Sequence, residues 1–206
     1  MEYVSLYTRQ HENSLFELET KGQITNKKIY VKLHLLDIAP FFLDRYDLFV
    51  KMAEERIKRS EGEDYPIWCS VSKYNCLKPI EKQVVYALKV PKDQVIYFDG
   101  AKWDLVLNNQ YIPRDQADKR DFQKLLQKNG IKHTFDIFDR KYTGAFDDVK
   151  ERIVNSWERI FEIDDRSIFK VQANLWKIEK TWVKKIIRPG DDFFKELEDF
   201  QDTWLE

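Results

Sequence analysis

Short stretches in which apolar and polar residues alternate predict strands along the chain. Alternation with a period of two is typical of a strand that buries one face. At the N-terminus, residues 3–8 place Val4 and Leu6 on one face and polar or aromatic side chains on the other. Runs rich in β-branched and aromatic residues, bounded by turn-like residues, predict further strands over 65–72, 84–90, 94–99 and 168–178.

A second pattern, in which apolar residues recur every three or four positions, predicts helices. It is strongest over 41–58, where Phe42, Tyr46 and Phe49 share a stripe, and over 146–161. Shorter helices are predicted over 14–21, 102–108 and 122–128, with a helical turn at 181 that leads into a strand and a highly charged terminal helix near 191–205.

The order of these elements predicts an α+β fold with a mixed, mostly antiparallel sheet and flanking helices. Regular alternation of strands and helices is missing, which argues against a doubly wound parallel sheet. A length of 206 residues fits a single domain over 1–206. Within it, residues 114–140 are polar and are interpreted as an insertion.

Composition narrows the class of protein. The chain is 43% hydrophobic and 15% aromatic, with six Trp, which excludes a largely disordered chain. No apolar run approaches the roughly 18 residues that cross a bilayer, and the N-terminus lacks the pattern of an export signal. We therefore expect a cytoplasmic protein without a membrane partner. The net charge of −1 gives no global signature of nucleic-acid binding, so any such contact would be local.

Common catalytic and metal-binding motifs are missing from the sequence, including the phosphate-binding loop, the dinucleotide fingerprint and the zinc-protease motif. The histidines His11, His34 and His133 are scattered, and Cys69 and Cys76 lack zinc-ligand spacing. We expect no metal centre.

The end of the first predicted strand carries the polar sequence Thr8-Arg9-Gln10. Fixed backbone donors beside these side chains suit a carboxamide or a phosphate. Together with the following helix and the Gly22-Gln23-Ile24 turn, this opening resembles the ADP-ribosyltransferase superfamily, including its DNA- and RNA-modifying branches. In that superfamily such an opening begins the NAD pocket.

Two later strands extend this resemblance. Ile67–Ser72 is similar to the second element of the superfamily, which often supplies a Ser or an aromatic residue. Val171–Trp176 is similar to the late strand, in which many members carry Gln-x-Glu or Glu-x-Glu. This chain has Gln172 but Asn174 in place of the Glu. Because that carboxylate orients the ribose and stabilises an oxocarbenium-like transition state, its absence puts transfer activity in doubt.

A second resemblance extends over nearly the whole chain. The sequence is similar to the bacterial "domain of unknown function 3841" family, which implies a bacterial or phage protein and brings no known activity. The segments that carry this resemblance are Leu6-Tyr7-Thr8, Tyr65–Trp68, Val95–Asp99, Trp103 with Asn108, Ser156–Phe161 and Gln172-Ala173 with Trp176.

The first hypothesis is an NAD-binding, ADP-ribosyltransferase-like protein that acts on a nucleic acid or a protein, in a toxin or phage-defence setting. The predicted catalytic residues are Arg9, Asp99 and Gln172, and the predicted cofactor-binding residues are Thr8, Gln10, Trp68, Ser70, Trp103, Asn108 and Trp176. If transfer occurs, Asp99 or Glu158 must supply the missing carboxylate. Asp99-Gly100 also fits a helix start or a turn.

The alternative is a non-catalytic or base-excising nucleic-acid-binding module with a Trp-lined pocket. Trp68, Trp103 and Trp176 would stack on flat ligands, whereas Trp157 fits core packing. The basic stretch 177–188 suits contact with phosphates, but it equally fits a strand edge protected by lysines. The sequence leaves the oligomeric state open.

Overall fold

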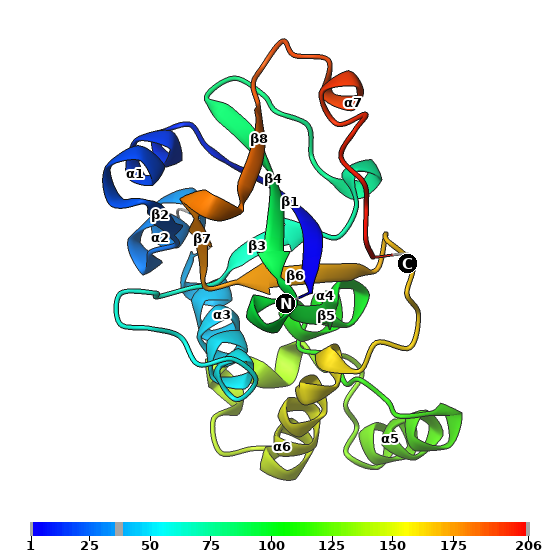
Figure 1. The fold of residues 1–206 in the computed structure, drawn as a ribbon. Coiled ribbons are helices and arrows are strands. Elements are labelled where there is room, and N and C mark those ends of the chain that lie inside the picture. The colour runs from blue at the N-terminus through cyan, green and yellow to red at the C-terminus, as the bar shows by residue number, and fades with distance from the viewer. Residues whose placement is uncertain (1, 36–38, 205–206) are drawn as a thin grey trace. The chain divides into compact units, whose positions relative to one another are not determined.

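The computed structural model describes residues 2–35 and 39–204 (Figure 1). The chain forms two compact units. Unit 1 combines residues 1–97 with residues 164–206, and unit 2 is the continuous stretch 98–163. The polar segment near 114–140, predicted as an insertion into a single domain, lies within unit 2.

A six-stranded sheet is the centre of unit 1, and its strands run in the order β5-β6-β3-β1-β4-β8. The pairs β1–β3, β1–β4, β3–β6 and β4–β8 are antiparallel. The strands are β1 (Tyr3–His11), β3 (Ile67–Ser70), β4 (Gln83–Pro91), β5 (Ile96–Asp99), β6 (Val171–Leu175) and β8 (Val183–Ile187). The predicted α+β class with a mostly antiparallel sheet and flanking helices is therefore confirmed.

The register of the central strands aligns residues that are far apart in the sequence. Tyr7 of β1 lies opposite Ser70 of β3, and Ser70 lies opposite Gln172 of β6. Residues directly opposite each other in a sheet point to the same face. These three side chains therefore form one row across three strands.

A small two-stranded sheet pairs β2 (Gln23–Thr25) with β7 (Lys177–Glu179). The helices of unit 1 are α1 (Asn13–Lys21), α2 (Lys28–Leu35), α3 (Ala39–Glu54) and α7 (Phe193–Glu196), with short 3-10 turns at Lys73–Asn75, Lys92–Gln94 and Lys180–Trp182. Gly22 ends α1 in the left-handed region with φ 71°, a conformation that glycine adopts without steric cost.

The terminal helix predicted near 191–205 is much shorter than expected. Within the described part of this segment the structure has only α7, followed by turns and irregular chain up to Trp204; Leu205 lies outside the described residues. After α7 the segment hydrogen-bonds to β1: the Ser5 N–H donates to Thr203 Oγ1 at 2.8 Å, and Ser5 Oγ donates to the Gln201 carbonyl. Its apolar residues pack on the sheet in a buried cluster of Tyr7, Val85, Ala87, Ile187, Phe193, Leu197 and Phe200.

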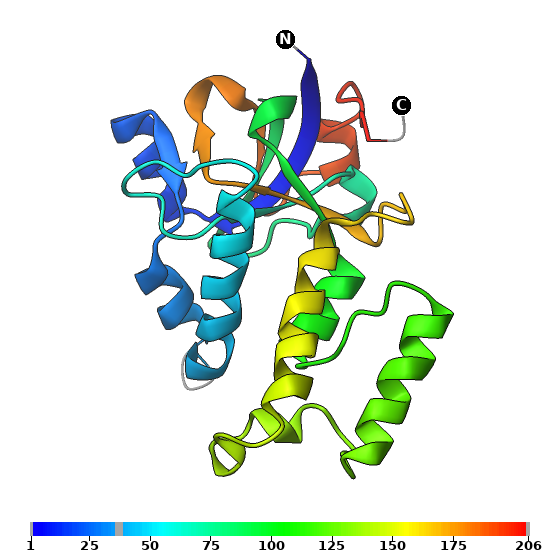
Figure 2. The same ribbon diagram turned by 90° about the horizontal axis from the view of Figure 1, so that it is seen from below.

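Unit 2 is helical beyond the end of β5. It contains α4 (Gly100–Leu107), α5 (Gln116–Lys128) and α6 (Asp147–Ser156), with short 3-10 turns at Asp136–Phe138 and Arg140–Tyr142. Figure 2 shows α5 and α6 side by side. The helix predicted over 146–161 changes to 3-10 geometry at Trp157–Phe161. Trp157 is fully buried and its Nε1 donates to the Gln110 carbonyl at 2.8 Å, so its predicted role in the core is confirmed.

Candidate functional site

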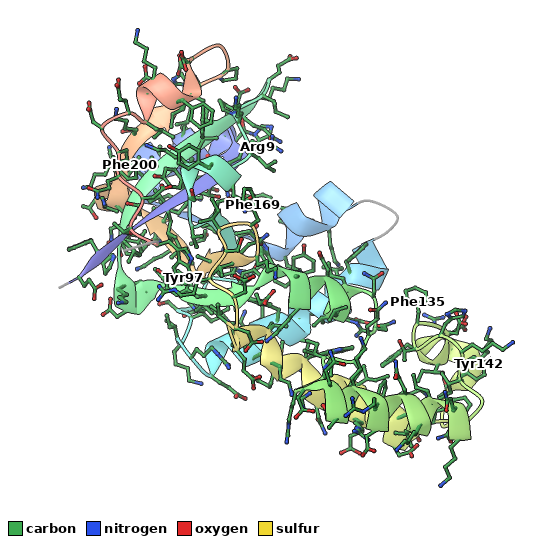
Figure 3. The ribbon with its side chains drawn as sticks, turned by 90° about the vertical axis from the view of Figure 1, so that its right-hand side faces the viewer. Arg9, Tyr97, Phe135, Tyr142, Phe169 and Phe200 are labelled. Carbon is green, nitrogen blue, oxygen red and sulfur yellow. The ribbon has the colours of Figure 1, made fainter. Side chains whose placement is uncertain are left out.

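Three predicted site residues, Arg9, Ser70 and Gln172, lie on one face of the sheet in unit 1. Ser70 and Gln172 belong to the row described above, and Arg9 is two positions beyond Tyr7 on β1. Since side chains alternate between the two faces of a strand, Arg9 points to the same side as Tyr7. We call this side the Arg9 face. Figure 3 shows Arg9 among the side chains of unit 1.

Loop residues that follow β3 engage two of these three side chains. The Arg9 guanidinium donates to the Lys78 carbonyl at 3.1 Å, and Ser70 Oγ donates to the Asn75 carbonyl at 3.0 Å. Gln172 is half-buried, and its amide makes no hydrogen bond within the described chain. Gln172 is therefore the member of the row whose polar group is available to a ligand.

Thr8 and Gln10 project to the opposite face, because they alternate with Tyr7 and Arg9 along β1. Thr8 is buried, and its hydroxyl donates to the Trp68 carbonyl at 2.7 Å and accepts from Gln10 Nε2 at 2.8 Å. The bond to Trp68 joins β1 to β3, and the Thr8 hydroxyl already donates one hydrogen bond and accepts another. The predicted Thr8-Arg9-Gln10 group is thus divided between two faces.

Asn174, at the position where the resemblance expects Glu, is fully buried beside β3. It lies opposite Trp68, and its Nδ2 donates to the Ile67 carbonyl at 3.4 Å. Its Oδ1 finds no donor among the described residues. An unmatched buried acceptor is rare, because burial without a partner costs about 1–3 kcal/mol.

The predicted aromatic residues of unit 1 are packed against the helical layer. Trp68 is half-buried, and its ring lies 5.7 Å from Tyr46 and 5.1 Å from Phe49 of α3. Trp176 is 5% exposed, and its Nε1 donates to the Ile57 carbonyl at 2.7 Å. Stacking on a flat ligand requires an exposed ring face, which Trp176 does not offer.

The other predicted site residues, Asp99, Trp103 and Asn108, belong to unit 2. Asp99 caps α4: its Oδ1 accepts the N–H groups of Ala101 and Lys102 at 2.9 and 3.0 Å. Trp103 is buried at 6% exposure. Asn108 follows the end of α4 and donates to the Asp104 carbonyl at 2.8 Å. Each has a local structural role within unit 2.

Sequence reasoning missed a hydrogen-bond cluster on the Arg9 face. Asp202, from the C-terminal segment, accepts from Tyr7 OH at 2.5 Å, from Ser72 Oγ at 2.6 Å and from the Lys73 N–H at 3.2 Å. Burial, and next the hydrogen bond to Asp202, raise the pKa of Tyr7 far above its usual value. Nearly two hundred positions separate Tyr7 from Asp202, so no local sequence signal could have joined them.

An open depression of about 430 Å³ lies beside this cluster, lined by Lys73, Tyr74, Glu198, Asp199, Gln201 and Asp202. Three carboxylates face one lysine, which disfavours a phosphate-bearing ligand on electrostatic grounds. The depression is therefore a poor match for the diphosphate of a dinucleotide, and the row of Arg9, Ser70 and Gln172 remains the better candidate.

Neither cysteine is an activated nucleophile. Burial raises the pKa of the Cys69 thiol well above its usual range, and burial also raises the pKa of Cys76, to about 12. A thiol with a raised pKa holds little reactive thiolate near neutral pH. Among the residues with a described placement there is no group of His, Cys, Asp and Glu side chains that could hold a metal ion. The side chain of His34 lies outside the described residues.

The basic stretch predicted over 177–188 is largely engaged within unit 1. Lys177 pairs with Glu179 at 2.8 Å, and Lys180 pairs with Glu19 at 2.7 Å. Lys184 and Lys185 donate to the backbone carbonyls of Thr181 and Glu196. These contacts favour the interpretation of this stretch as a protected strand edge.

The fold and site therefore define an α+β protein with polar side chains across the centre of an antiparallel sheet. A family model described as "Domain of unknown function (DUF3841)" matches residues 5–184, and the chain belongs to this family. No curated protein and no solved structure matches the chain significantly. None of the helices within 2–35 and 39–204 has the length and apolar character needed to cross a bilayer.

Proposed function

We propose that this protein binds NAD on the Arg9 face of unit 1, that its fold is of the ADP-ribosyltransferase type, and that it acts on a nucleic-acid or protein acceptor. One observation carries the proposal. The three strands that resemble this superfamily, β1, β3 and β6, are consecutive in the sheet, and Arg9, Ser70 and Gln172 share one face of them.

The residues of this face suit a dinucleotide in two respects. Arg9 offers a charged donor of the kind that binds phosphate oxygens. The unengaged amide of Gln172 can both donate and accept, which matches a ribose hydroxyl or a carboxamide. Ser70 lies between them in the sheet and contributes a hydroxyl once its bond to the Asn75 carbonyl is exchanged.

The chemistry of transfer would use the N-glycosidic bond that NAD supplies. Cleaving this bond develops positive charge on the ribose, which a carboxylate stabilises. Asn174 is neutral, so the late strand provides no such group. The two carboxylates that the sequence suggested as substitutes, Asp99 and Glu158, belong to unit 2, and the Asp99 carboxylate already accepts two N–H groups at the start of α4. NAD binding is therefore the part of the proposal that the residues support best.

The experiment is a comparison of unfolding temperatures with NAD, ADP-ribose and nicotinamide. A ligand at about 100 times its Kd stabilises the folded protein by about 2.7 kcal/mol, which raises Tm by roughly 5–11 °C at this chain length. We expect this increase with NAD in the unaltered protein and its loss in Arg9→Ala and Gln172→Ala. Gln123→Ala, an exposed glutamine in unit 2, is the matched control and should keep the increase.

An NAD-independent Tm in the unaltered protein would contradict the proposal. So would an equal loss of the response in Gln123→Ala and Gln172→Ala, since the effect would then not come from the Arg9 face. Circular dichroism of each variant separates loss of binding from loss of folding.

A further inference from the structure

The outer face of α5 in unit 2 carries a row of basic side chains. Arg120, Lys124 and Lys128 are spaced four residues apart, so they follow one another along the same side of the helix. All three are exposed. Between 119 and 132 the sequence holds five basic residues and one acidic residue, Asp121. We call Arg120, Lys124 and Lys128 the α5 basic row.

The charges of this row are not neutralised within the described chain. Neither Arg120, Lys124 nor Lys128 forms an ion pair or a side-chain hydrogen bond with a residue in the described ranges. The lysines near 177–185, by contrast, are held by carboxylates and carbonyls of unit 1. Two lysines of the stretch 177–188, Lys177 and Lys180, are thus paired with glutamates, whereas no member of the α5 basic row has a carboxylate partner among the described residues.

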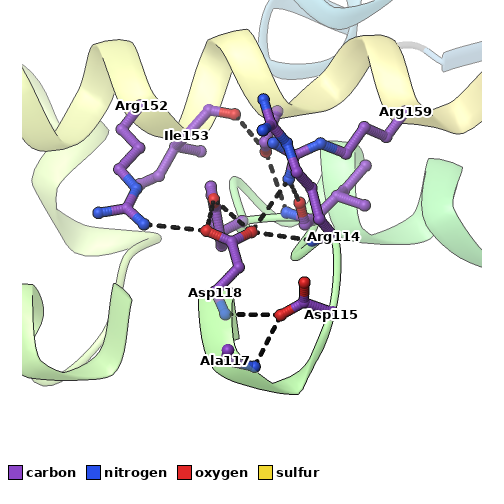
Figure 4. Close-up of polar contacts among 10 residues, drawn as sticks. Arg114, Asp115, Ala117, Asp118, Arg152, Ile153 and Arg159 are labelled. Atoms are coloured by element: carbon purple, nitrogen blue, oxygen red, sulfur yellow. Dashed lines mark hydrogen bonds and ion pairs between the residues drawn. The ribbon is translucent and has the colours of Figure 1, made fainter. Parts of the chain in front are cut away.

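The opposite side of α5 is anchored by a polar network (Figure 4). Asp118 accepts from Tyr111 OH and the Arg114 N–H, each at 2.8 Å, and from Arg152 at 3.0 Å. Arg159 approaches the same carboxylate at 3.4 Å. The anchored side of α5 therefore fixes the direction in which the basic row points.

An aromatic contact strengthens this anchor. The ring of Phe122, which is buried, stacks on Tyr111 with 4.1 Å between centroids, and the Arg152 guanidinium lies over both rings. A helix held in this way presents its outer side chains at low entropic cost, because the backbone is already ordered before a partner binds.

The spacing of the row suits a repeating polyanion. A helical rise of 1.5 Å per residue places successive members about 6 Å apart and spreads the row over about 12 Å. In a DNA duplex each strand places a phosphate about every 3.4 Å of helix axis, so a row of about 12 Å spans several of them. Gln123 and Gln127 are exposed beside the row and add amides that bond to phosphate oxygens or base edges.

We infer that the α5 basic row is a docking surface for a nucleic-acid backbone. This inference rests on the proposed function in one respect: it names nucleic acid, and not protein, as the class of acceptor. The docking itself needs no NAD, so it can be measured separately.

The test measures binding of a fluorescently labelled single-stranded oligonucleotide by anisotropy at several salt concentrations. The variant Arg120→Gln/Lys124→Gln/Lys128→Gln removes three charges and keeps residues that favour helix. Each lost phosphate contact lowers the slope of log K against log salt by about 0.7 for a single strand. We expect the slope to fall by about 2 and the affinity at low salt to fall at least tenfold.

The matched control is Lys177→Gln/Lys180→Gln/Lys184→Gln, which removes the same charge from unit 1. It should leave the slope nearly unchanged. The inference is overturned if the unaltered protein binds no oligonucleotide, or if both variants lose the same slope. It is also overturned if the row instead binds vesicles of phosphatidylserine and phosphatidylcholine, because the surface would then serve a membrane. NAD-dependent stabilisation with no oligonucleotide binding would remove this inference alone.

Discussion

At the scale of single residues, Asp118 shows how a few donors decide the state of a carboxyl group. Its partial burial raises the pKa, but hydrogen bonds from the Arg114 N–H, Tyr111 and Arg152 and the charge of Arg159 outweigh it and lower the pKa to about 2. The folded state therefore favours the charged form. Asp118 contributes stability above the ordinary carboxyl pKa near 4, and this contribution disappears as the pH falls through about 2.

We predict that Asp118→Asn lowers the free energy of unfolding at pH 7 and that the difference from the unaltered protein shrinks as the pH approaches 2. Urea titrations between pH 2 and pH 7 measure this. Asp121→Asn is the control, because Asp121 is exposed and forms no ion pair with a described residue. If Asp118→Asn lowers the free energy of unfolding by the same amount at every pH, the negative charge of Asp118 is not what stabilises α5.

The two thiols give a second prediction at this scale. Because burial raises the pKa of Cys69 and Cys76, both should react slowly with Ellman's reagent in the folded protein at pH 8. Cys76 is half-buried and Cys69 is 4% exposed, so Cys76 should react first. If either thiol of the folded protein reacts as fast as it does in urea, the burial described for that thiol is wrong.

At the scale of secondary structure, substitutions of Asp99 test whether this predicted catalytic residue acts only as the N-cap of α4. Replacing an N-cap Asp by Ala typically costs about 1 kcal/mol, whereas Ser retains most of the cap. We predict that Asp99→Ala loses about this much stability and that Asp99→Ser loses much less, both measured by urea unfolding. If NAD-dependent activity is found and Asp99→Ser retains it, Asp99 is structural and Glu158 becomes the carboxylate to test.

At the scale of the whole molecule, the C-terminal segment completes the core of unit 1. Leu197 is fully buried in the cluster that contains Tyr7 and Phe200, and Asp202 accepts from Tyr7 and Ser72. This segment begins after residue 184, where the family match ends. It nevertheless covers part of the Arg9 face.

We predict that Leu197→Ala lowers the free energy of unfolding by about 2–5 kcal/mol, the usual cost of a cavity at a fully buried leucine. Phe169→Ala removes a larger side chain that is 71% exposed, and it should change the free energy of unfolding by no more than about 0.5 kcal/mol. Figure 3 labels this residue together with Phe200 of the buried cluster. An equal effect of both substitutions, measured by urea unfolding, would show that the segment does not contribute to the core.

Much of the fold could be predicted because its signals are local. Alternation along 3–8 and 84–90 located β1 and β4, periodicity located α3 and α6, and Gly22 marked the end of α1. The prediction of a long terminal helix near 191–205 was wrong, because hydrogen bonds and packing to distant residues of β1 hold this charged, helix-like sequence instead. Tertiary contacts of this kind override local propensity.

The sequence by itself determined the α+β class, the absence of regular strand–helix alternation and the core role of Trp157, since each follows from spacing along the chain. Only the tertiary structure decided which polar residues share a face. It placed Arg9 with Ser70 and Gln172, sent Thr8 and Gln10 to the other side, and brought Asp202 to Tyr7. It also left Arg120, Lys124 and Lys128 of α5 without a carboxylate partner among the described residues, whereas Lys177 and Lys180 each pair with a glutamate. The reason is physical: strand register and long-range pairing place side chains beside one another that the sequence keeps far apart.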